Sequence, residues 1–175
     1  MSVQSLFLEC SVAKLNQFMS RIEVCLGKLN EEQIWARGSE TENAIGNLVL
    51  HLTGNLGQWI ISGLGGETFE RNRDGEFAAR EGRSATQLAA NLRAALENTN
   101  RIISGLSDDR LTDSYEIQKY TVSGVEAVLH VVEHFAMHTG QIIFATKMIT
   151  GEDLGFYSHL RGSLHRKATT HEGRP

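Results

Sequence analysis

The sequence of 175 residues contains a single proline, Pro175, at its last position, and only two cysteines. No proline ring therefore interrupts a helix before the end of the chain. Cys10 and Cys25 lie in one helical pattern, where a rise of about 1.5 Å per residue separates them by roughly 22 Å, too far for a disulfide. Neither belongs to a CxxC motif of a zinc or redox site. We interpret both as small hydrophobic residues of the core.

Long apolar runs and an excess of positive charge are also missing. Lysine and arginine total 17 against 21 acidic residues, which gives a formal net charge of −4. No apolar run approaches the roughly 20 residues of a membrane span, and the N-terminus lacks the pattern of a signal peptide. No basic cluster favours nucleic acid or a membrane surface as a partner. We therefore expect a cytoplasmic protein that binds neither.

Disorder of the bulk of the chain is excluded by its ordinary composition. Hydrophobic residues make up 41% and charged residues 22% of the sequence, so enough apolar surface exists to form one core. We predict a single domain over residues 1–157. Residues 158–175 are polar and contain three histidines among basic and small residues, and we expect them to form a weakly ordered C-terminal tail.

Four stretches of the chain carry apolar residues at steps of three and four, the period of an amphipathic helix: residues 3–29, 43–64, 84–106 and 122–149. The third begins with Ser84-Ala85-Thr86-Gln87, a capping-box pattern. Residues 65–83 are too polar to join a core and are interpreted as a crossover loop, and residues 107–120 as an extended connection. The pattern predicts an all-α fold, a four-helix bundle with a long crossover between its second and third helices.

Glycine is concentrated in the second predicted helix. Gly46, Gly54, Gly57 and Gly63 lie within residues 43–64, and each costs a helix interior roughly 1 kcal/mol relative to alanine. Their presence indicates either that another helix or a ligand approaches closely, or that this helix is shorter or broken.

The fourth predicted helix contains His130, His134 and His138 at steps of four. At about 100° per residue, His134 and His138 fall on the side of the apolar stripe, His130 lies at its edge, and Glu126 and Glu133 point away. Two imidazoles are therefore expected to face the interior of the bundle, where polar groups need partners.

A histidine pair at positions i and i+4 can share one metal ion, although such pairs also occur by chance on helix surfaces. A third ligand has to come from elsewhere. His51 is the only other histidine within a predicted helix, and alone it would be interpreted as a surface residue. No glutamate follows the first histidine of a pair directly, and none precedes a histidine by three positions, which argues against zincin proteases and di-iron carboxylate bundles.

Together these motifs resemble the DinB-like (YfiT-like) family of metal-dependent, damage-inducible helical bundles. The stretches that carry the resemblance are residues 45–56 with Trp59, residues 130–142 and residues 150–157. The resemblance covers nearly the whole chain except its last fifteen or so residues. It implies a four-helix bundle with a long crossover, often a homodimer, with a divalent metal, commonly zinc or nickel, held by three histidines.

In this sequence the metal ligands implied by the resemblance are His51, His134 and His138. His130 matches a position that is frequently histidine and is assigned to the second shell or to the pocket lining. The sequence departs from many relatives at Thr139, where histidine or arginine is common around that step. This departure leaves the ligands intact and bears on the substrate pocket.

The resemblance also implies a metal-dependent transferase or hydrolase acting on a small electrophilic substrate, because characterised relatives use low-molecular-weight thiols. We expect Asn55, Gln141 and His130 to orient the substrate or shuttle protons, and Trp59 to form an apolar wall. No carboxylate falls on the histidine face, which favours thiol transfer over hydrolysis with a general base. No catalytic residue is assigned. The alternative is a non-catalytic metal-binding or stress-related dimeric protein.

Overall fold

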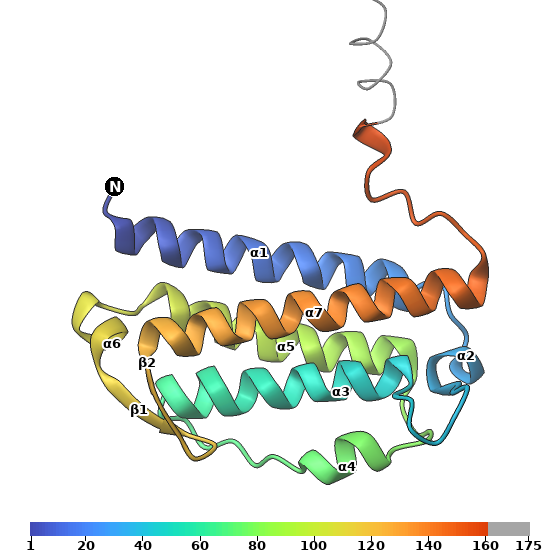
Figure 1. The fold of residues 1–175 in the computed structure, drawn as a ribbon, viewed down its shortest axis with the longest axis horizontal. Coiled ribbons are helices and arrows are strands. Elements are labelled where there is room, and N and C mark those ends of the chain that lie inside the picture. The colour runs from blue at the N-terminus through green and yellow to red at the C-terminus, as the bar shows by residue number, and fades with distance from the viewer. Residues whose placement is uncertain (161–175) are drawn as a thin grey trace, which may run out of the picture.

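The computed structural model describes residues 1–160, and four long helices lie side by side in it (Figure 1). They are α1 (Val3–Leu26), α3 (Ile45–Leu56), α5 (Ala85–Ser104) and α7 (Gly124–Thr150), and α3 continues as the π-helix η1 (Gly57–Leu64). Helix α1 packs against α5 and α7, and α3 packs against the same two helices. The predicted four-helix bundle with its long crossover is confirmed.

Capping residues explain where two of these helices begin. The Ser84 hydroxyl accepts a hydrogen bond from the backbone of Gln87, and the Gln87 side chain accepts one from the backbone of Ser84, so the predicted capping box is present. Ser123 and Glu126 form the same arrangement at the start of α7. Helix α7 ends at Gly151, whose φ of 69° is the left-handed conformation that glycine adopts without strain.

The connections contain more structure than the sequence predicted. The supposed crossover loop includes the short helix α4 (Arg73–Ala78), and it contributes a buried side chain, Glu76. The supposed extended connection contains α6 (Asp108–Thr112) and a hairpin of β1 (Ser114–Ile117) and β2 (Tyr120–Ser123). Helix α2 (Glu31–Trp35) and the 3-10 turn η2 (Ser158–Leu160) complete the described elements. Short elements have too few residues for a period to show, which is why the pattern missed them.

The core fills the space between the four helices. Its most buried side chains include Leu15, Ile22, Leu52 and Phe135, and burial of each such residue contributes about 1.5–3 kcal/mol to folding. Cys25 belongs to this core but Cys10 is exposed, so the prediction of a core position was wrong for Cys10. Fifteen residues turn the helix by roughly 60° beyond whole turns, enough to move one of the two out of the buried stripe.

Close approach explains all four glycines in the second long helix. A Cβ atom would lie 2.7 Å from the Trp35 ring at Gly46, 2.0 Å from Glu76 Oε1 at Gly54, 2.1 Å from the Phe69 ring at Gly57 and 2.6 Å from Cδ1 of Ile117 at Gly63. The groups that approach come from α2, from the crossover segment and from β1. The helix is not broken, because α3 continues directly as η1.

Within residues 1–160, no helix is both long and apolar enough to cross a membrane. Of the predicted tail, only Ser158–Leu160 belong to the described part, and residues 161–175 lie outside it. The boundary at residue 157 stays a prediction.

Candidate metal centre

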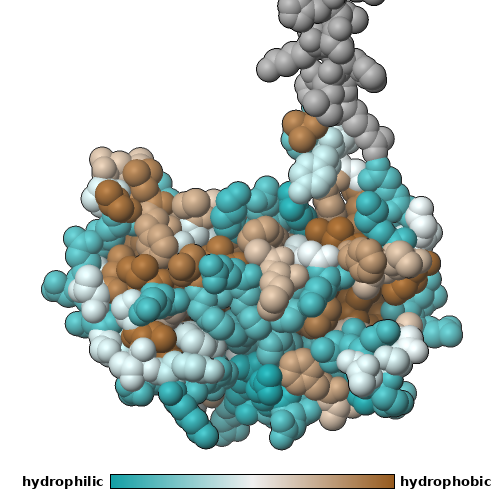
Figure 2. Space-filling model, in the orientation of Figure 1, coloured by the Kyte–Doolittle hydropathy of each residue, from teal (hydrophilic) through white to brown (hydrophobic). Residues whose placement is uncertain are grey.

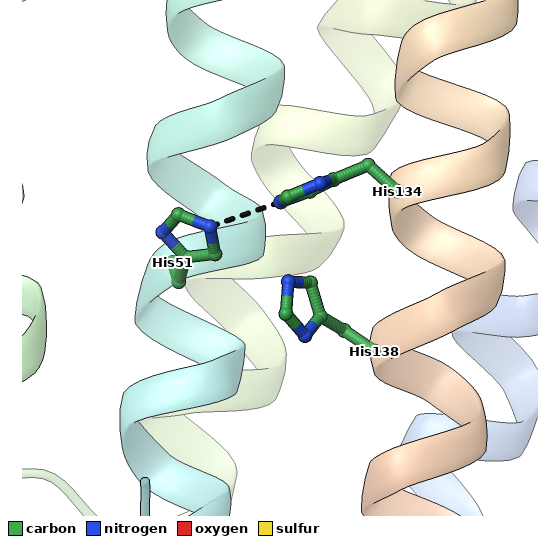
Figure 3. A group of neighbouring side chains, drawn as sticks. All are labelled: His51, His134 and His138. Atoms are coloured by element: carbon green, nitrogen blue, oxygen red, sulfur yellow. Dashed lines mark hydrogen bonds between the residues drawn. The ribbon is translucent and has the colours of Figure 1, made fainter. Parts of the chain in front are cut away.

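Three histidines meet between α3 and α7. His51 projects from α3, and His134 and His138 project from α7 toward it (Figure 3). One ring nitrogen of each lies within 4.8 Å of the other two, and the Nε2 atoms of His51 and His134 are 2.9 Å apart. His51 and His138 are buried and His134 is half-buried. The structure thus brings together the three histidines that the sequence pattern singled out.

His138 is oriented by a neighbour one turn further along the same helix. Its Nδ1 atom lies 2.6 Å from Oε1 of Gln141, so Nδ1–H donates to this oxygen. The lone pair of Nε2 is then left for the space shared by the three rings. Gln141, assigned from the sequence to the second shell or the pocket, thus contacts a candidate ligand directly.

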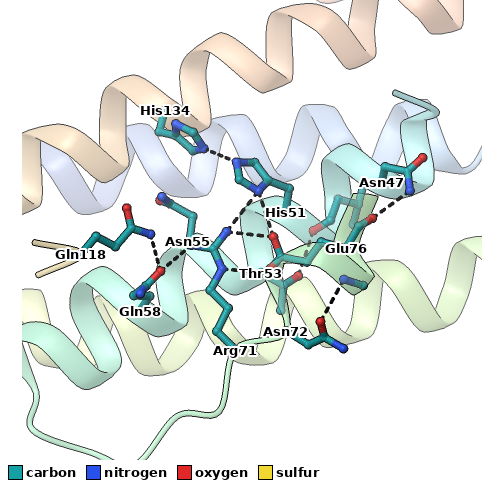
Figure 4. A network of polar contacts seen from close by, with 12 residues as sticks. Asn47, His51, Thr53, Asn55, Gln58, Arg71, Asn72, Glu76, Gln118 and His134 are labelled. Carbon is teal, nitrogen blue, oxygen red and sulfur yellow. Dashed lines mark hydrogen bonds and ion pairs between the residues drawn. The ribbon is translucent and has the colours of Figure 1, made fainter. Parts of the chain in front are cut away.

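His51 is held from the opposite side by the crossover segment. Its Nδ1 lies 2.9 Å from Oε2 of Glu76 and 3.1 Å from Nη2 of Arg71 (Figure 4). Arg71 also donates two hydrogen bonds to Glu76, from Nε to Oε1 at 2.7 Å and from Nη2 to Oε2 at 2.8 Å. The side chains of Arg71 and Glu76 are only 7% and 9% exposed. A buried ion pair therefore supports the histidine from α4 and the chain that leads into it.

Sequence reasoning missed Glu76 because the polar crossover was interpreted as lying outside the core. One signal could have indicated it. Gly54 lies three residues after His51 and leaves the space that Glu76 Oε1 occupies, since a Cβ at Gly54 would be 2.0 Å from that oxygen. A glycine one turn from a candidate ligand is a sign that another chain segment reaches that ligand.

His130 forms a side wall next to the three rings. Its ring stacks on that of Trp59 at a centroid distance of 3.7 Å, and its Nε2 is 3.2 Å from Nδ2 of Asn55. Its centroid lies 5.3 Å from that of His134. His130 does not belong to the group of converging nitrogens. The indole N–H of Trp59 is buried and has no hydrogen-bond partner among the described residues.

Burial favours the uncharged form of His130, His134 and His138. Burial, together with the neighbouring histidines, lowers the pKa of His134 to about 3. Burial also lowers the pKa of His138 and of His130. Burial alone would raise the pKa of Glu76, but its hydrogen bonds to Arg71 and His51 outweigh this and lower it. His134 and His138 are thus neutral imidazoles at neutral pH, and an ionised carboxylate lies behind His51.

This donor set fits a divalent metal ion. Metal binding requires deprotonated ligands, and neutral imidazoles meet this condition. Ligating histidines usually donate their second ring N–H to a carboxylate or carbonyl oxygen, and Glu76 and Gln141 place such an oxygen at Nδ1 of His51 and of His138. Metal–nitrogen bonds of about 2.1 Å place tetrahedral ligand nitrogens roughly 3.4 Å apart. The three ring nitrogens lie within 4.8 Å of one another, so the cluster could hold a metal ion.

Comparisons with known proteins place the chain in a family and identify its fold. A family model described as "Protein of unknown function (DUF1572)" matches residues 2–163. No curated protein matches the chain.

Solved structures of several other proteins share the fold. A conserved protein from Enterococcus faecalis has a TM-score of 0.72 at 15% identity, over 87% of this chain and 99% of that one. A DinB-like protein from Bacillus cereus has a TM-score of 0.65 at 17% identity, over 81% and 91% of the two chains. A DinB-like protein from Bacillus subtilis, YjoA, has a TM-score of 0.64 at 18% identity, over 84% and 96%.

Proposed function

We propose that this chain, which belongs to the DUF1572 family and has the DinB-like fold, is an enzyme that depends on a divalent metal held by His51, His134 and His138. The observation that carries the proposal is the convergence of three ring nitrogens to within 4.8 Å of one another. Two of these rings also have an oxygen acceptor at their other nitrogen. Three protein ligands leave a coordination position open, as in catalytic rather than structural zinc sites.

Zinc or nickel is the metal that we propose, because uncharged imidazole nitrogens suit both ions. When bound, the ion would supply a Lewis acid that lowers the pKa of a water molecule or thiol at the open position. We assign no catalytic role to a protein side chain.

The reaction that we propose is transfer of a low-molecular-weight thiol to a small electrophilic substrate. Glu76 contacts His51 through a carboxylate oxygen, but both its oxygens are engaged by Arg71 and His51. It is therefore not free to act as a general base. A thiol that brings its own nucleophile needs no such base, whereas hydrolysis of an unactivated substrate does.

The neighbours of the cluster would shape the substrate pocket. We propose that His130 and Asn55 orient the substrate and that the Trp59 ring forms a wall of the pocket. The unpaired indole N–H of Trp59 is a donor that a substrate acceptor could satisfy after a small rearrangement. Gln141 would act on the metal through His138.

The metal site is tested by measuring zinc and nickel bound to the purified full chain by elemental analysis. We expect about one ion per chain, with at least tenfold less in His51→Ala and in His138→Ala, because each variant loses one of three ligands. His159→Ala is the matched control, since His159 is exposed and lies outside the cluster. Full metal content in both site variants, or none in the wild-type protein, would contradict the site.

Catalysis is tested separately by following the consumption of bacterial thiols with a panel of small electrophiles. We expect turnover by the metal-loaded chain that is lost in His51→Ala and His138→Ala and kept in His159→Ala. A chain that binds metal and turns over no substrate would support the alternative function, that of a non-catalytic metal-binding protein.

A further inference from the structure

The Nδ1 atom of His51 lies between a hydrogen-bond donor and an acceptor. Nη2 of Arg71 is 3.1 Å away and can only donate, whereas Oε2 of the ionised Glu76 is 2.9 Å away and can only accept. A single ring nitrogen cannot satisfy both at once. It accepts from Arg71 when it carries no proton and donates to Glu76 when it does.

The Nε2 atom of His51, on the opposite side of the ring, can likewise donate or accept a hydrogen bond. The Nε2 atoms of His51 and His134 are 2.9 Å apart, a distance at which one hydrogen lies between them when no metal ion is bound. If His51 supplies that hydrogen, its Nδ1 is bare and accepts from Arg71. If His134 supplies it, the Nδ1–H of His51 donates to Glu76. Both arrangements leave no ring nitrogen of His51 without a partner.

We propose that Arg71 and Glu76 together form a clamp that positions His51 and gives either tautomer of its ring a hydrogen-bond partner at Nδ1. Metal uptake then selects the tautomer that carries its proton on Nδ1. This inference rests on the proposed metal site. A metal ion requires a bare Nε2 on His51, and the proton of the neutral ring must then lie on Nδ1, where Glu76 accepts it. Arg71 and Glu76 are thus positioning residues that act through His51.

The clamp is held at its outer end by a second contact. Nη1 of Arg71 donates to Oε1 of Gln58 at 2.6 Å, and the side-chain amide of Gln118 donates to the same oxygen (Figure 4). Gln118 lies in the turn of the β1–β2 hairpin. Polar contacts therefore run from the hairpin through Gln58 of η1 and the crossover segment to His51. They fix the guanidinium so that Nη2 stays within reach of both Nδ1 and Glu76.

The first test compares zinc affinities of full-length chains by competition with a chelator. Glu76→Gln keeps the shape of the side chain but weakens the acceptor, so we expect its affinity to fall about 10- to 100-fold. Arg71→Met removes the partner of the competing tautomer but also leaves the buried Glu76 without its ion pair, so we expect its affinity to fall by less than that of Glu76→Gln. Glu67→Gln is the matched control, because Glu67 lies on the same crossover segment and pairs with Arg101 away from the histidines; its affinity should not change.

The second test observes the ring directly. Nitrogen-15 NMR of the wild-type chain should show the Nδ1 of His51 protonated once zinc is bound, and both tautomers in exchange without zinc. In metal-free Arg71→Met, the Nδ1–H form should dominate. Circular dichroism of each variant identifies any that fails to fold, and the wild-type spectra remain decisive in that case.

Three results would overturn the clamp: an affinity of Glu76→Gln equal to that of Glu67→Gln, an equal loss in Arg71→Met and Glu76→Gln, or a zinc-bound His51 without a proton on Nδ1. A wild-type chain that binds no zinc would instead count against the proposed function itself.

Discussion

The half-buried imidazole of His134 makes folding sensitive to pH. Burial, together with the neighbouring His138 and His51, lowers its pKa from the ordinary value of 6.5 to about 3. The unfolded chain therefore binds more protons than the folded chain between these pH values. As far as His134 is concerned, the free energy of unfolding is therefore highest above pH 6.5 and decreases as the pH falls toward 3.

We expect the free energy of unfolding of the metal-free protein to decrease between pH 6.5 and 5, before most carboxylates titrate. One proton accounts for at most about 1.4 kcal/mol per pH unit, less for the part of the ring that solvent screens. Urea unfolding at several pH values measures this. In His134→Asn the decrease should be smaller, and an equal decrease in the two proteins would show that the lowered pKa of His134 is not its cause.

The sequence predicted the site residues that lie on long regular helices and missed the one that reaches the site from an irregular segment. His134 and His138 share a helix, so the helical period alone places them on one face. His51 joins them because its own helix must turn its apolar face to the same core. Glu76 reaches His51 from a segment whose path no period describes, so only tertiary contact reveals it. The sequence assigned His130, Asn55 and Trp59 to the surroundings of the site, but it could not predict that His130 contacts the other two.

Among the elements, the packing of the crossover segment on α3 depends on the absence of a side chain at Gly54. On an ordinary helix position, glycine to alanine gains up to about 1 kcal/mol of stability. At Gly54 the new Cβ would meet Glu76 Oε1 at 2.0 Å and Arg71 Nε at 2.8 Å, and both belong to a buried ion pair that cannot move without cost.

We therefore predict that Gly54→Ala lowers the free energy of unfolding by about 1–3 kcal/mol and weakens metal binding. Gly140→Ala is the matched control, because Gly140 is an exposed position of α7 where a Cβ would meet no atom within 4 Å. It should be neutral or stabilising by up to about 1 kcal/mol. Denaturant unfolding measures the free energy of unfolding of both variants. A Gly54→Ala protein as stable as Gly140→Ala would rule out the tight contact between Gly54 and Glu76.

The four long helices could be predicted because each repeats its apolar spacing over many turns, and Ser84 marks the start of one of them. Helix α4 could not, since six residues give too short a pattern and its charged residues suggested a solvated loop. The change from α-helix to π-helix at Gly57 could not be predicted from the spacing of the apolar residues either. It places Trp59 against His130, and π-helical segments are frequent at functional sites.

For the molecule as a whole, the exposed apolar side chains gather on the α1 and α7 side. Along α7 they include Leu129, Met137, Phe144 and Met148, exposed by 45% to 71%, and Leu6 of the adjacent α1 is 52% exposed. Figure 2 shows hydrophobic surface in the region where these two helices run. Two adjacent helices of this length, each about 10 Å wide and roughly 36–40 Å long, cover about 800 Å², the area that one partner contributes to a standard interface.

We propose that a second copy of the chain covers this face, as the family resemblance also implies. Sedimentation equilibrium should then give about twice the chain mass of 19.4 kDa. Phe144→Glu would place a charge within the apolar surface, and we expect it to shift the equilibrium to the monomer. Tyr120→Glu is the control, because Tyr120 is similarly exposed, at 61%, but lies on the β1–β2 hairpin. A wild-type monomer at all concentrations, or a Phe144→Glu protein as dimeric as Tyr120→Glu, would exclude this face as the interface.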